Sequence, residues 1–173
     1  NHMKIVAALF TFSFFLNFAF AVEFTNLNKI KISGLSKTKK YVVSNELGLK
    51  EGSEVSLSEI ENGILNLRNT NLFASVTYEL VGEEDKDLLV KVEEKWTTIP
   101  IVKFSSGGGV GQLTVGAYDP NLLGHYLEVG GQYERLDSAN SGVVWFKNPR
   151  LFGKKQGLDI QLWSTKRLRT KYE

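Results

Sequence analysis

The chain has 173 residues, which is enough for one ordinary domain or two small ones. A formal net charge of only +2 gives no overall field that would attract nucleic acid, and the absence of cysteine excludes a disulfide framework and a thiolate metal site. Aromatic residues (11 Phe, 6 Tyr, 3 Trp) and 16 glycines are typical of twisted sheets and barrels, although they also fit other small β proteins.

The N-terminus predicts an export signal. Two residues that look like a cloning scar precede Met3, an apolar stretch runs from residue 5 to 18, and Ala19-Phe20-Ala21 forms a small-residue cleavage site. We therefore expect residues 1–21 to be scar and signal peptide, followed by a linker at 22–28 that begins the mature chain outside the cytoplasm. The alternative is an uncleaved anchor over residues 5–22, because these 18 residues are barely enough to cross a bilayer.

Residues 29–96 are expected to form a small α/β module. The predicted elements are a strand over 29–34, a helix over 36–47, a helix that begins after Ser56, and strands over 75–80 and 88–93. Ser36 is expected to cap the first helix, and Ser56 with Glu59 forms a capping box for the second. The order β-α-α-β-β places two helices on one face of a three-stranded sheet.

This order resembles the POTRA (polypeptide-transport-associated) domain. The matching phrases are Ile30-Lys31-Ile32-Ser33-Gly34, then the segment from Asn69 to Val76, and last the segment from Leu88 to Lys95. The family usually has a glycine where this chain has Asn71. The departure is mild, because asparagine tolerates the left-handed conformation that a glycine would supply.

After Trp96 the helical period gives way to long segments of alternating apolar and polar residues. We expect residues 97–173 to form about five antiparallel strands of a β-meander, with apolar side chains outward and polar ones inward, as in a transmembrane barrel. The candidates for the lipid-facing side are Leu113, Val115, Leu127, Val129, Leu158, Ile160 and Leu162. A soluble β-sandwich would alternate in the same way.

Two phrases in this half repeat one pattern, (Asp/Asn)-Pro-x-Leu-apolar-Gly, at a spacing of 29 residues. They are Asp119-Pro120-Asn121-Leu122-Leu123-Gly124 and Asn148-Pro149-Arg150-Leu151-Phe152-Gly153. Proline suits a turn and glycine permits unusual backbone angles, so we interpret Asp119, Pro120, Gly124, Asn148, Pro149 and Gly153 as structural turn residues. The spacing puts both turns on one edge of one sheet, which would be the periplasmic rim if the first module lies in the periplasm.

The two modules in this order resemble one superfamily. It contains the outer-membrane barrel-assembly factors, their translocation-and-assembly relatives and the two-partner secretion transporters. The resemblance implies a periplasmic POTRA domain followed by a barrel of about 16 strands. Five strands cannot close, since about eight are needed. We therefore expect the chain to be the N-terminal part of a longer barrel protein, and assembly from several chains is the alternative.

No enzyme is predicted. His125 stands alone, no serine lies in a nucleophile elbow, and the glycines after Ser106 are not followed by the Lys-Ser/Thr pair of a phosphate loop. The acidic clusters Glu83-Glu84-Asp85 and Glu93-Glu94 are expected to be a hairpin tip and a solvated strand face. We expect no catalytic residue, no metal and no cofactor.

The resemblance implies a role in outer-membrane protein assembly or polypeptide translocation. The POTRA-like sheet would bind extended clients by β-augmentation, at strand edges marked by Ile30, Ile32, Val76, Tyr78 and Leu80. The expected partners are unfolded or extended polypeptides, outer-membrane lipid and accessory periplasmic proteins, with no nucleic acid. The alternative is a periplasmic or cell-division scaffold module that binds protein without transporting it.

Overall fold

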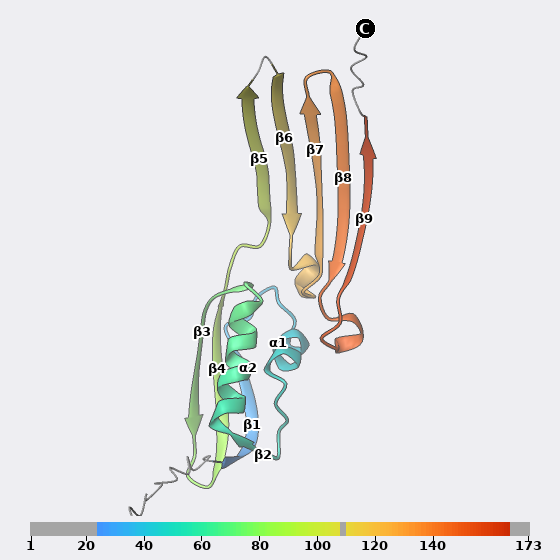
Figure 1. Ribbon diagram of the computed structural model, residues 1–173. Helices are drawn as coiled ribbons and strands as arrows, with labels where there is room; N and C mark the ends of the chain where they lie inside the picture. Colours follow the sequence, from blue (N-terminus) through green and yellow to red (C-terminus); the bar gives the residue numbers. More distant parts are fainter. Residues whose placement is uncertain (1–23, 108–109, 167–173) are drawn as a thin grey trace, which may run out of the picture.

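The structure is a computed structural model that describes residues 24–107 and 110–166, so the predicted export signal lies outside the described residues. Two modules follow one another along the chain (Figure 1). The first contains β1 (Phe24–Ser33), α1 (Lys40–Leu47), β2 (Ser53–Ser56), α2 (Leu57–Asn69), β3 (Phe73–Val81) and β4 (Asp85–Glu94). Within the described ranges, none of the helices has the length and apolar character needed to cross a membrane.

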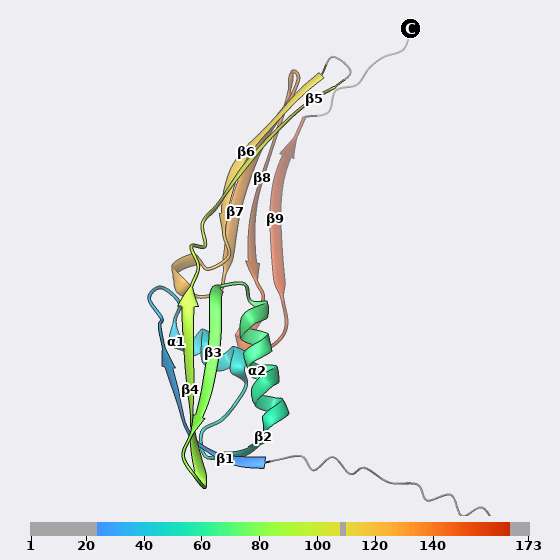
Figure 2. The same ribbon diagram turned by 90° about the vertical axis from the view of Figure 1, so that its left-hand side faces the viewer.

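The first module is a four-stranded sheet with order β2-β1-β4-β3, and both helices cover one of its faces (Figure 2). β1 and β4 run parallel in the centre of the sheet, while β2 and β3 are antiparallel at its two edges. The prediction of three strands was wrong by one, because the segment 53–56 pairs with the start of β1. β1 also begins at Phe24, so most of the predicted linker is strand.

The core lies between the helices and this sheet. The residues that are less than 2% exposed include Leu27, Val43, Ile60, Ile64, Leu67, Leu72, Leu88 and Val90. They come from α1, α2, the two central strands β1 and β4, and the segment after α2. Each fully buried aliphatic side chain contributes roughly 1.5–3 kcal/mol, so this one cluster holds the module together.

The start of α1 differs from the prediction. Ser36 does not cap the helix, which begins only at Lys40, and Lys39 at the cap position makes no side-chain hydrogen bond. The Ser36 hydroxyl instead donates to the carboxylate of Glu94 at 2.9 Å. The residues between Ser36 and Lys39 are thus held as a loop by β4.

The start of α2 is as predicted. The Ser56 hydroxyl accepts from the Glu59 amide at 3.3 Å, and the Glu59 carboxylate accepts from the Ser56 amide at 2.7 Å. Asn71, after the helix, has a φ of 59°, so it does take the left-handed conformation expected where relatives carry glycine.

The second module is a five-stranded antiparallel sheet in which each strand pairs with the next along the chain (Figure 1). Its strands are β5 (Ile99–Gly107), β6 (Val110–Asp119), β7 (Glu128–Leu136), β8 (Ala139–Asn148) and β9 (Leu158–Thr165). The predicted number of about five strands is confirmed. The connection between β7 and β8 is short, because only Asp137 and Ser138 separate the two strands, with Asp137 at a φ of 50°.

The register of this sheet places apolar residues on one face. Val115, Tyr133, Gly142 and Ser164 are cross-strand partners, and the next row on the same face is Ala117, Gly131, Val144 and Leu162. Six of the seven predicted lipid-facing residues lie on this face, whereas Leu127 lies just before β7 and is partly buried. Contact of this face with lipid stays a prediction.

The opposite face contains a close packing of tryptophan on glycine. A Cβ on Gly130 would collide with the ring of Trp145, so only glycine leaves room for that indole. The indole N–H donates to the Glu128 carboxylate at 2.8 Å, and Glu128 also pairs with Lys147 at 3.0 Å. These contacts lie near the end of the sheet that adjoins the first module.

We expect Ser56→Ala to lower the free energy of unfolding by about 1 kcal/mol, because it removes the acceptor of the helix cap. Urea denaturation followed by circular dichroism measures the change. Ser33→Ala, at the exposed end of β1, is the control and should change the value by less than about 0.5 kcal/mol. Equal losses in the two variants would contradict the role of the cap.

Candidate functional site

The outer edge of β3 is the longest strand edge of the first module that no other described strand covers. The guanidinium of Arg68 donates to the Val76 carbonyl at 2.9 Å, so this carbonyl points away from β4. Because hydrogen bonding alternates along an antiparallel pair, the N–H and C=O groups of Tyr78 and Leu80 also point outward. The side chains of these three residues face the core. Their outward-pointing backbone N–H and C=O groups are the groups with which a partner strand would pair.

The outer edge of β1 is more restricted. β2 pairs with its first residues, from Phe24 to Leu27, and the Ile30 amide donates to the Glu51 carboxylate at 2.8 Å. Only the backbone around Ile32 stays without such a partner among the described residues. Of the five predicted edge residues, Val76, Tyr78 and Leu80 therefore lie on the more accessible edge.

The two repeated phrases form the same turn. In the first copy the Asp119 carboxylate accepts from the Asn121 amide at 2.8 Å, and in the second the Asn148 side-chain oxygen accepts from the Arg150 amide at 2.9 Å. An aspartate or asparagine that bonds two residues ahead mimics a backbone turn. The predicted role of these positions in turns agrees with this geometry.

The rest of each turn also matches. Leu123 and Phe152, at the fifth position, have φ values of 53° and 55°, and the following Gly124 and Gly153 have 82° and 72°. Two successive residues with positive φ reverse the chain sharply, which explains the glycine at the sixth position.

The first turn contacts the loop before α1. The side-chain amide of Asn121, which is 1% exposed, donates to the Thr38 hydroxyl at 2.9 Å, and the Lys39 amide donates to the Gly124 carbonyl at 2.9 Å. A Cβ on Gly124 would collide with the carbonyl oxygen of Lys37. Gly124 is thus required by this contact as well as by its φ.

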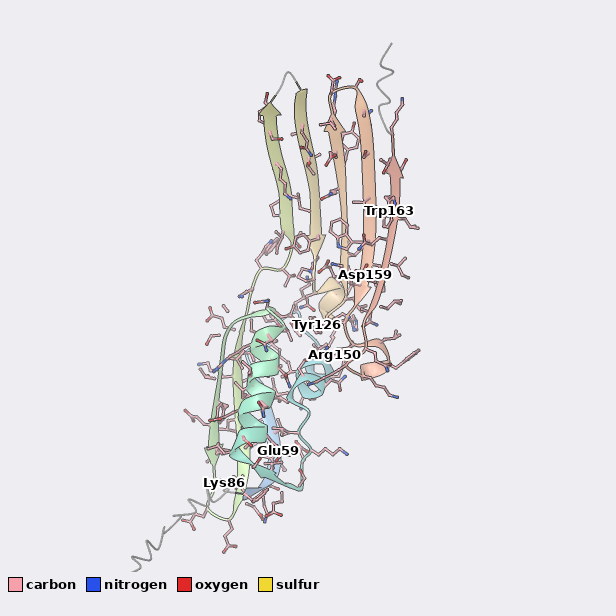
Figure 3. All side chains as sticks on the ribbon, in the orientation of Figure 1. Glu59, Lys86, Tyr126, Arg150, Asp159 and Trp163 are labelled. Carbon is pink, nitrogen blue, oxygen red and sulfur yellow. The ribbon has the colours of Figure 1, made fainter. Side chains whose placement is uncertain are left out.

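The second turn contacts the other end of α1. The Arg150 guanidinium donates to both carboxylate oxygens of Glu46, at 2.6 and 2.7 Å. Arg150 is labelled in Figure 3, close to Tyr126. The side chain of Glu46 is 1% exposed and that of Arg150 is 29% exposed. Hydrogen bonding to Glu46 raises the pKa of Arg150 above its already high ordinary value, so the guanidinium stays charged. A bidentate ion pair of this kind fixes the relative orientation of the two side chains as well as the distance between them.

We use the name junction for these contacts between α1 with its preceding loop and the two repeated turns. Two further pairs belong to it: the Lys37 ammonium lies 2.7 Å from the Asp119 carboxylate, and the Tyr41 hydroxyl lies 2.9 Å from Nδ1 of His125. His125 is therefore part of this contact. The junction contains acids, bases and amides that bind one another, and no cluster of metal-binding side chains occurs in the part of the chain that the structure describes.

Glu94 holds the loop of the junction in place, contrary to the expectation of a solvated strand face. Its carboxylate accepts from the amides of Ser36, Lys37 and Thr38 at 3.2, 2.8 and 2.8 Å, and from the Ser36 hydroxyl. Burial alone would raise the pKa of Glu94, but hydrogen bonds from the Lys37 and Thr38 amides outweigh burial and lower the pKa to about 2.

Sequence reasoning missed the junction. Its partners are 82 to 104 residues apart in the chain, and no local pattern links them. One signal in the sequence could have pointed to it. The two repeated phrases form the same turn but differ at the third position, which is Asn121 in one and Arg150 in the other, so this position could have been expected to make a different contact in each copy.

We expect Glu94 to make stability depend on pH. Its pKa in the folded chain, about 2, lies below the ordinary 4.5, so its contribution is complete above pH 4.5 and is lost as the pH falls toward 2. Urea unfolding should show Glu94→Gln to be less stable by roughly 1.5–3 kcal/mol at neutral pH, with a difference that shrinks in acid. The control is Glu93→Gln, on the exposed side of the strand; a pH-independent difference for Glu94→Gln would contradict this role.

We expect Arg150→Ala to loosen the junction, because it leaves the buried Glu46 carboxylate without its partner at a cost of about 2–5 kcal/mol. Spin labels at Leu65 in α2 and Ser141 in β8 should report a broader distance distribution by pulsed electron resonance. The charge swap Glu46→Arg with Arg150→Glu should narrow it again, and Arg135→Ala, at the far end of the sheet, is the control. An unchanged distribution for Arg150→Ala would contradict the proposed role of the pair.

A family model matches the first module. Residues 25–95 match the family model for POTRA, described as a surface antigen variable number repeat. The outer membrane protein assembly factor BamA of Nitratidesulfovibrio vulgaris is 30% identical over 137 residues, which are 72% of this chain and 16% of that protein. The chain thus spans a small part of the length of this curated relative.

Solved structures show the same fold. BamA from Haemophilus ducreyi lacking POTRA domains 1–3 aligns over 80% of this chain and 27% of its own, with a TM-score of 0.67 and 18% identity. CdiB from Acinetobacter baumannii aligns over 71% of this chain and 25% of its own, with a TM-score of 0.52 and 17% identity. Residues 25–95 are a POTRA domain, and the two modules together have the fold seen in these BamA and CdiB structures.

Proposed function

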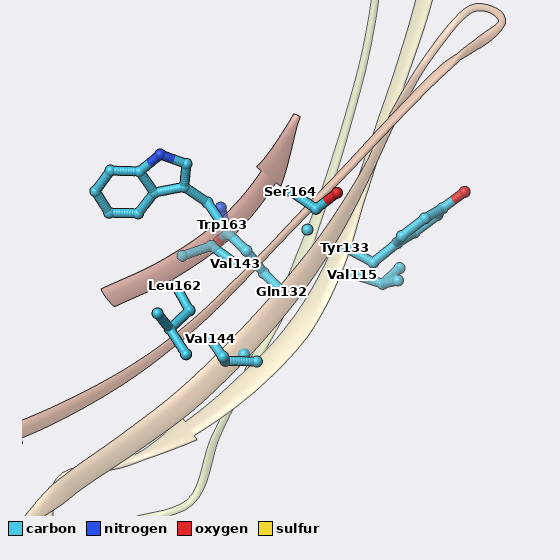
Figure 4. Close-up of a pocket in the computed structure, with 10 residues that line it drawn as sticks. Val115, Gln132, Tyr133, Val143, Val144, Leu162, Trp163 and Ser164 are labelled. Carbon is cyan, nitrogen blue, oxygen red and sulfur yellow. The ribbon is translucent and has the colours of Figure 1, made fainter. Parts of the chain in front are cut away.

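We propose that this chain belongs to an outer-membrane protein that assembles or translocates polypeptides, with its POTRA domain in the periplasm. The five-stranded sheet would form part of the barrel. The continuous apolar face of the sheet supports this proposal (Figure 4, where Val144 and Leu162 lie side by side and Trp163 points away). A scaffold module without transport would leave that apolar face without a use.

The proposed client site is the outer edge of β3. The observation that carries it is the outward backbone of Tyr78 and Leu80, whose N–H and C=O groups repeat at every second residue. An extended segment can pair with such an edge through main-chain hydrogen bonds, which read few side chains and suit varied clients. A shallow hollow beside Arg68 and the start of β3 adjoins the same edge.

The β3 edge is preferred to β1 for a physical reason. At β1, an arriving strand would have to displace β2 or the Glu51 carboxylate, and each displacement costs a hydrogen bond of about 1 kcal/mol or more. At β3 the only such contact in the described chain is the one between Arg68 and the Val76 carbonyl.

The junction would hold the outer edge of β3 at a fixed position and orientation relative to the proposed barrel strands. Contacts at both ends of α1, through Thr38 and Glu46, join the POTRA domain to the two repeated turns. A client strand paired with β3 would therefore be presented at a constant orientation to the rim of the barrel. We propose that handover of the client from the POTRA domain depends on this orientation.

We expect Tyr78→Pro to weaken client binding at least about fivefold, because proline removes an outward N–H without touching the bonds to β4. Fluorescence anisotropy with a labelled peptide of alternating apolar and polar residues measures the affinity. Ile32→Pro makes the matched change on β1 and should alter it less than twofold. Circular dichroism of both variants checks folding. Loss of binding in Ile32→Pro but not in Tyr78→Pro would move the site to β1.

A further inference from the structure

A stripe of side chains on α2 runs beside the outer edge of β3. The helix packs against this strand, and the two lie side by side in both ribbon views (Figure 1 and Figure 2). The guanidinium of Arg68 donates to the outward carbonyl of Val76 at 2.9 Å, so this side of the helix faces the edge. Residues three or four positions apart are neighbours on a helix surface. The α2 stripe therefore consists of Leu57, Glu61, Leu65 and Arg68.

The α2 stripe is open to a partner. Leu57, Glu61 and Leu65 are exposed, and Glu61 forms no ion pair with any other residue in the described ranges. α1 packs on the other side of α2, where the side-chain amide of Asn66 donates to the backbone carbonyl of Glu46 at 3.3 Å. The side of α2 that faces β3 thus offers two apolar side chains, one acid and one base.

A client strand paired with β3 would bring every second side chain to the α2 stripe. The side chain of Val76 belongs to the core under the helices, and a client residue directly opposite it would point to the same face. Client residues two and four positions away along the strand would do the same. The groups that these side chains meet are therefore set by the order of residues along α2.

The helix and the strand run in opposite directions. Only three residues separate the end of α2 from the start of β3, and β3 returns along the helix (Figure 1). At about 1.5 Å per residue, Glu61 lies roughly 10 Å back along α2 from Arg68. At about 3.4 Å per residue, Leu80 lies roughly 14 Å along β3 from Val76. A client residue opposite Val76 would lie beside Arg68. One opposite Leu80 would lie within reach of Glu61 if its side chain is long.

Arg68 does not block the edge that it touches. The Val76 carbonyl has two lone pairs, so it can accept from a client amide while it keeps its bond to Arg68. A guanidinium has five N–H donors, and the contact with Val76 uses one of them. A hollow of about 460 Å³ beside Arg68 and the first residues of β3 gives room for a client side chain. Carboxylates are the side chains that a guanidinium binds most strongly.

We propose that the α2 stripe selects the direction and register of the client strand. It favours a segment with a basic, an apolar and an acidic residue at two-residue intervals, in that order from the N-terminus. The inference rests on the proposed client site at the β3 edge. The client acid would bind Arg68, the apolar residue would pack on Leu65, and the base would pair with Glu61. The client then runs antiparallel to β3, which is the more stable pairing per residue. The reverse order of charges would place like charges together in that pairing.

The test compares three labelled peptides of alternating valine and threonine by fluorescence anisotropy, with the whole protein in lipid nanodiscs. The first has lysine at its third position, valine at its fifth and glutamate at its seventh. The second exchanges the two charges, and the third has glutamine at both positions. An exposed ion pair changes affinity by up to about fivefold. The first peptide should therefore bind about three- to tenfold more tightly than the other two, and added salt should remove the difference.

A double variant of the protein tests the two charges of the stripe. Arg68→Glu with Glu61→Arg should invert the preference, so that the second peptide binds more tightly than the first. Lys50→Glu with Glu54→Arg makes the same exchange at exposed positions near β2 and should leave the preference unchanged. Circular dichroism checks folding. An unchanged preference in a folded Arg68→Glu, Glu61→Arg variant would overturn the proposal. The peptide comparison on the unaltered protein decides the matter if the variant fails to fold.

Disulfide trapping tests the direction, since this chain has no cysteine of its own. A cysteine at the N-terminus of the first peptide should bond with Glu83→Cys, beyond the end of β3, and not with Asn69→Cys, at the end of α2. Equal trapping at both positions would overturn the fixed direction. Equal affinity for the three peptides, with loss of binding in Tyr78→Pro, would overturn the selection and leave the β3 edge as the client site. Binding by none of them, or binding that Tyr78→Pro leaves unchanged, would overturn both.

Discussion

The arrangement of the two modules depends on how Glu94 binds the loop before α1. Its carboxylate accepts three successive backbone amides, so it specifies the path of the chain and not merely the position of one side chain. Without that path, the Thr38 hydroxyl and the Lys39 amide would not be aligned for the first repeated turn. A charged acceptor is suited to this task, because hydrogen bonds to an ionised group are about twice as strong as neutral ones.

The two repeated turns show how one backbone design can serve two different contacts. Their hydrogen bonds and φ values agree closely, while the side chain at the third position makes a different contact in each turn. Asn121 makes a buried neutral contact, whereas Arg150 neutralises a buried acid. Because neutral amides and ion pairs do not substitute for one another in a buried site, the two turns cannot exchange places on α1.

Much of the fold could be predicted from local patterns. Alternation identified the long strands, the capping box located the start of α2, and the resemblance at Asn71 anticipated a left-handed residue. These signals succeed because the physical cause lies within a few residues of its effect. Ser36 was misjudged for the opposite reason: a good local cap was available in the sequence, but a carboxylate 58 residues away binds that serine.

The candidate client site was less predictable from the sequence than the fold. The backbone edge of β3 follows from strand order once the fold is recognised, but its advantage over β1 depends on Glu51 and on the short strand β2. β2 has only four residues, too few for alternation to distinguish it from a loop. The junction was not predictable at all, since its specificity arises only when two modules meet.

The double attachment of α1 has a mechanical consequence. Thr38 lies before the helix and Glu46 near its end, and they bind turns that belong to two different hairpins, β6–β7 and β8–β9. α1 and the loop before it therefore connect two neighbouring hairpins. If one hairpin slid past the other along the strand direction, these contacts would be strained or broken. A folded α1 would resist slippage of strand register at that end of the sheet, which makes the POTRA domain a template for the strands that follow it.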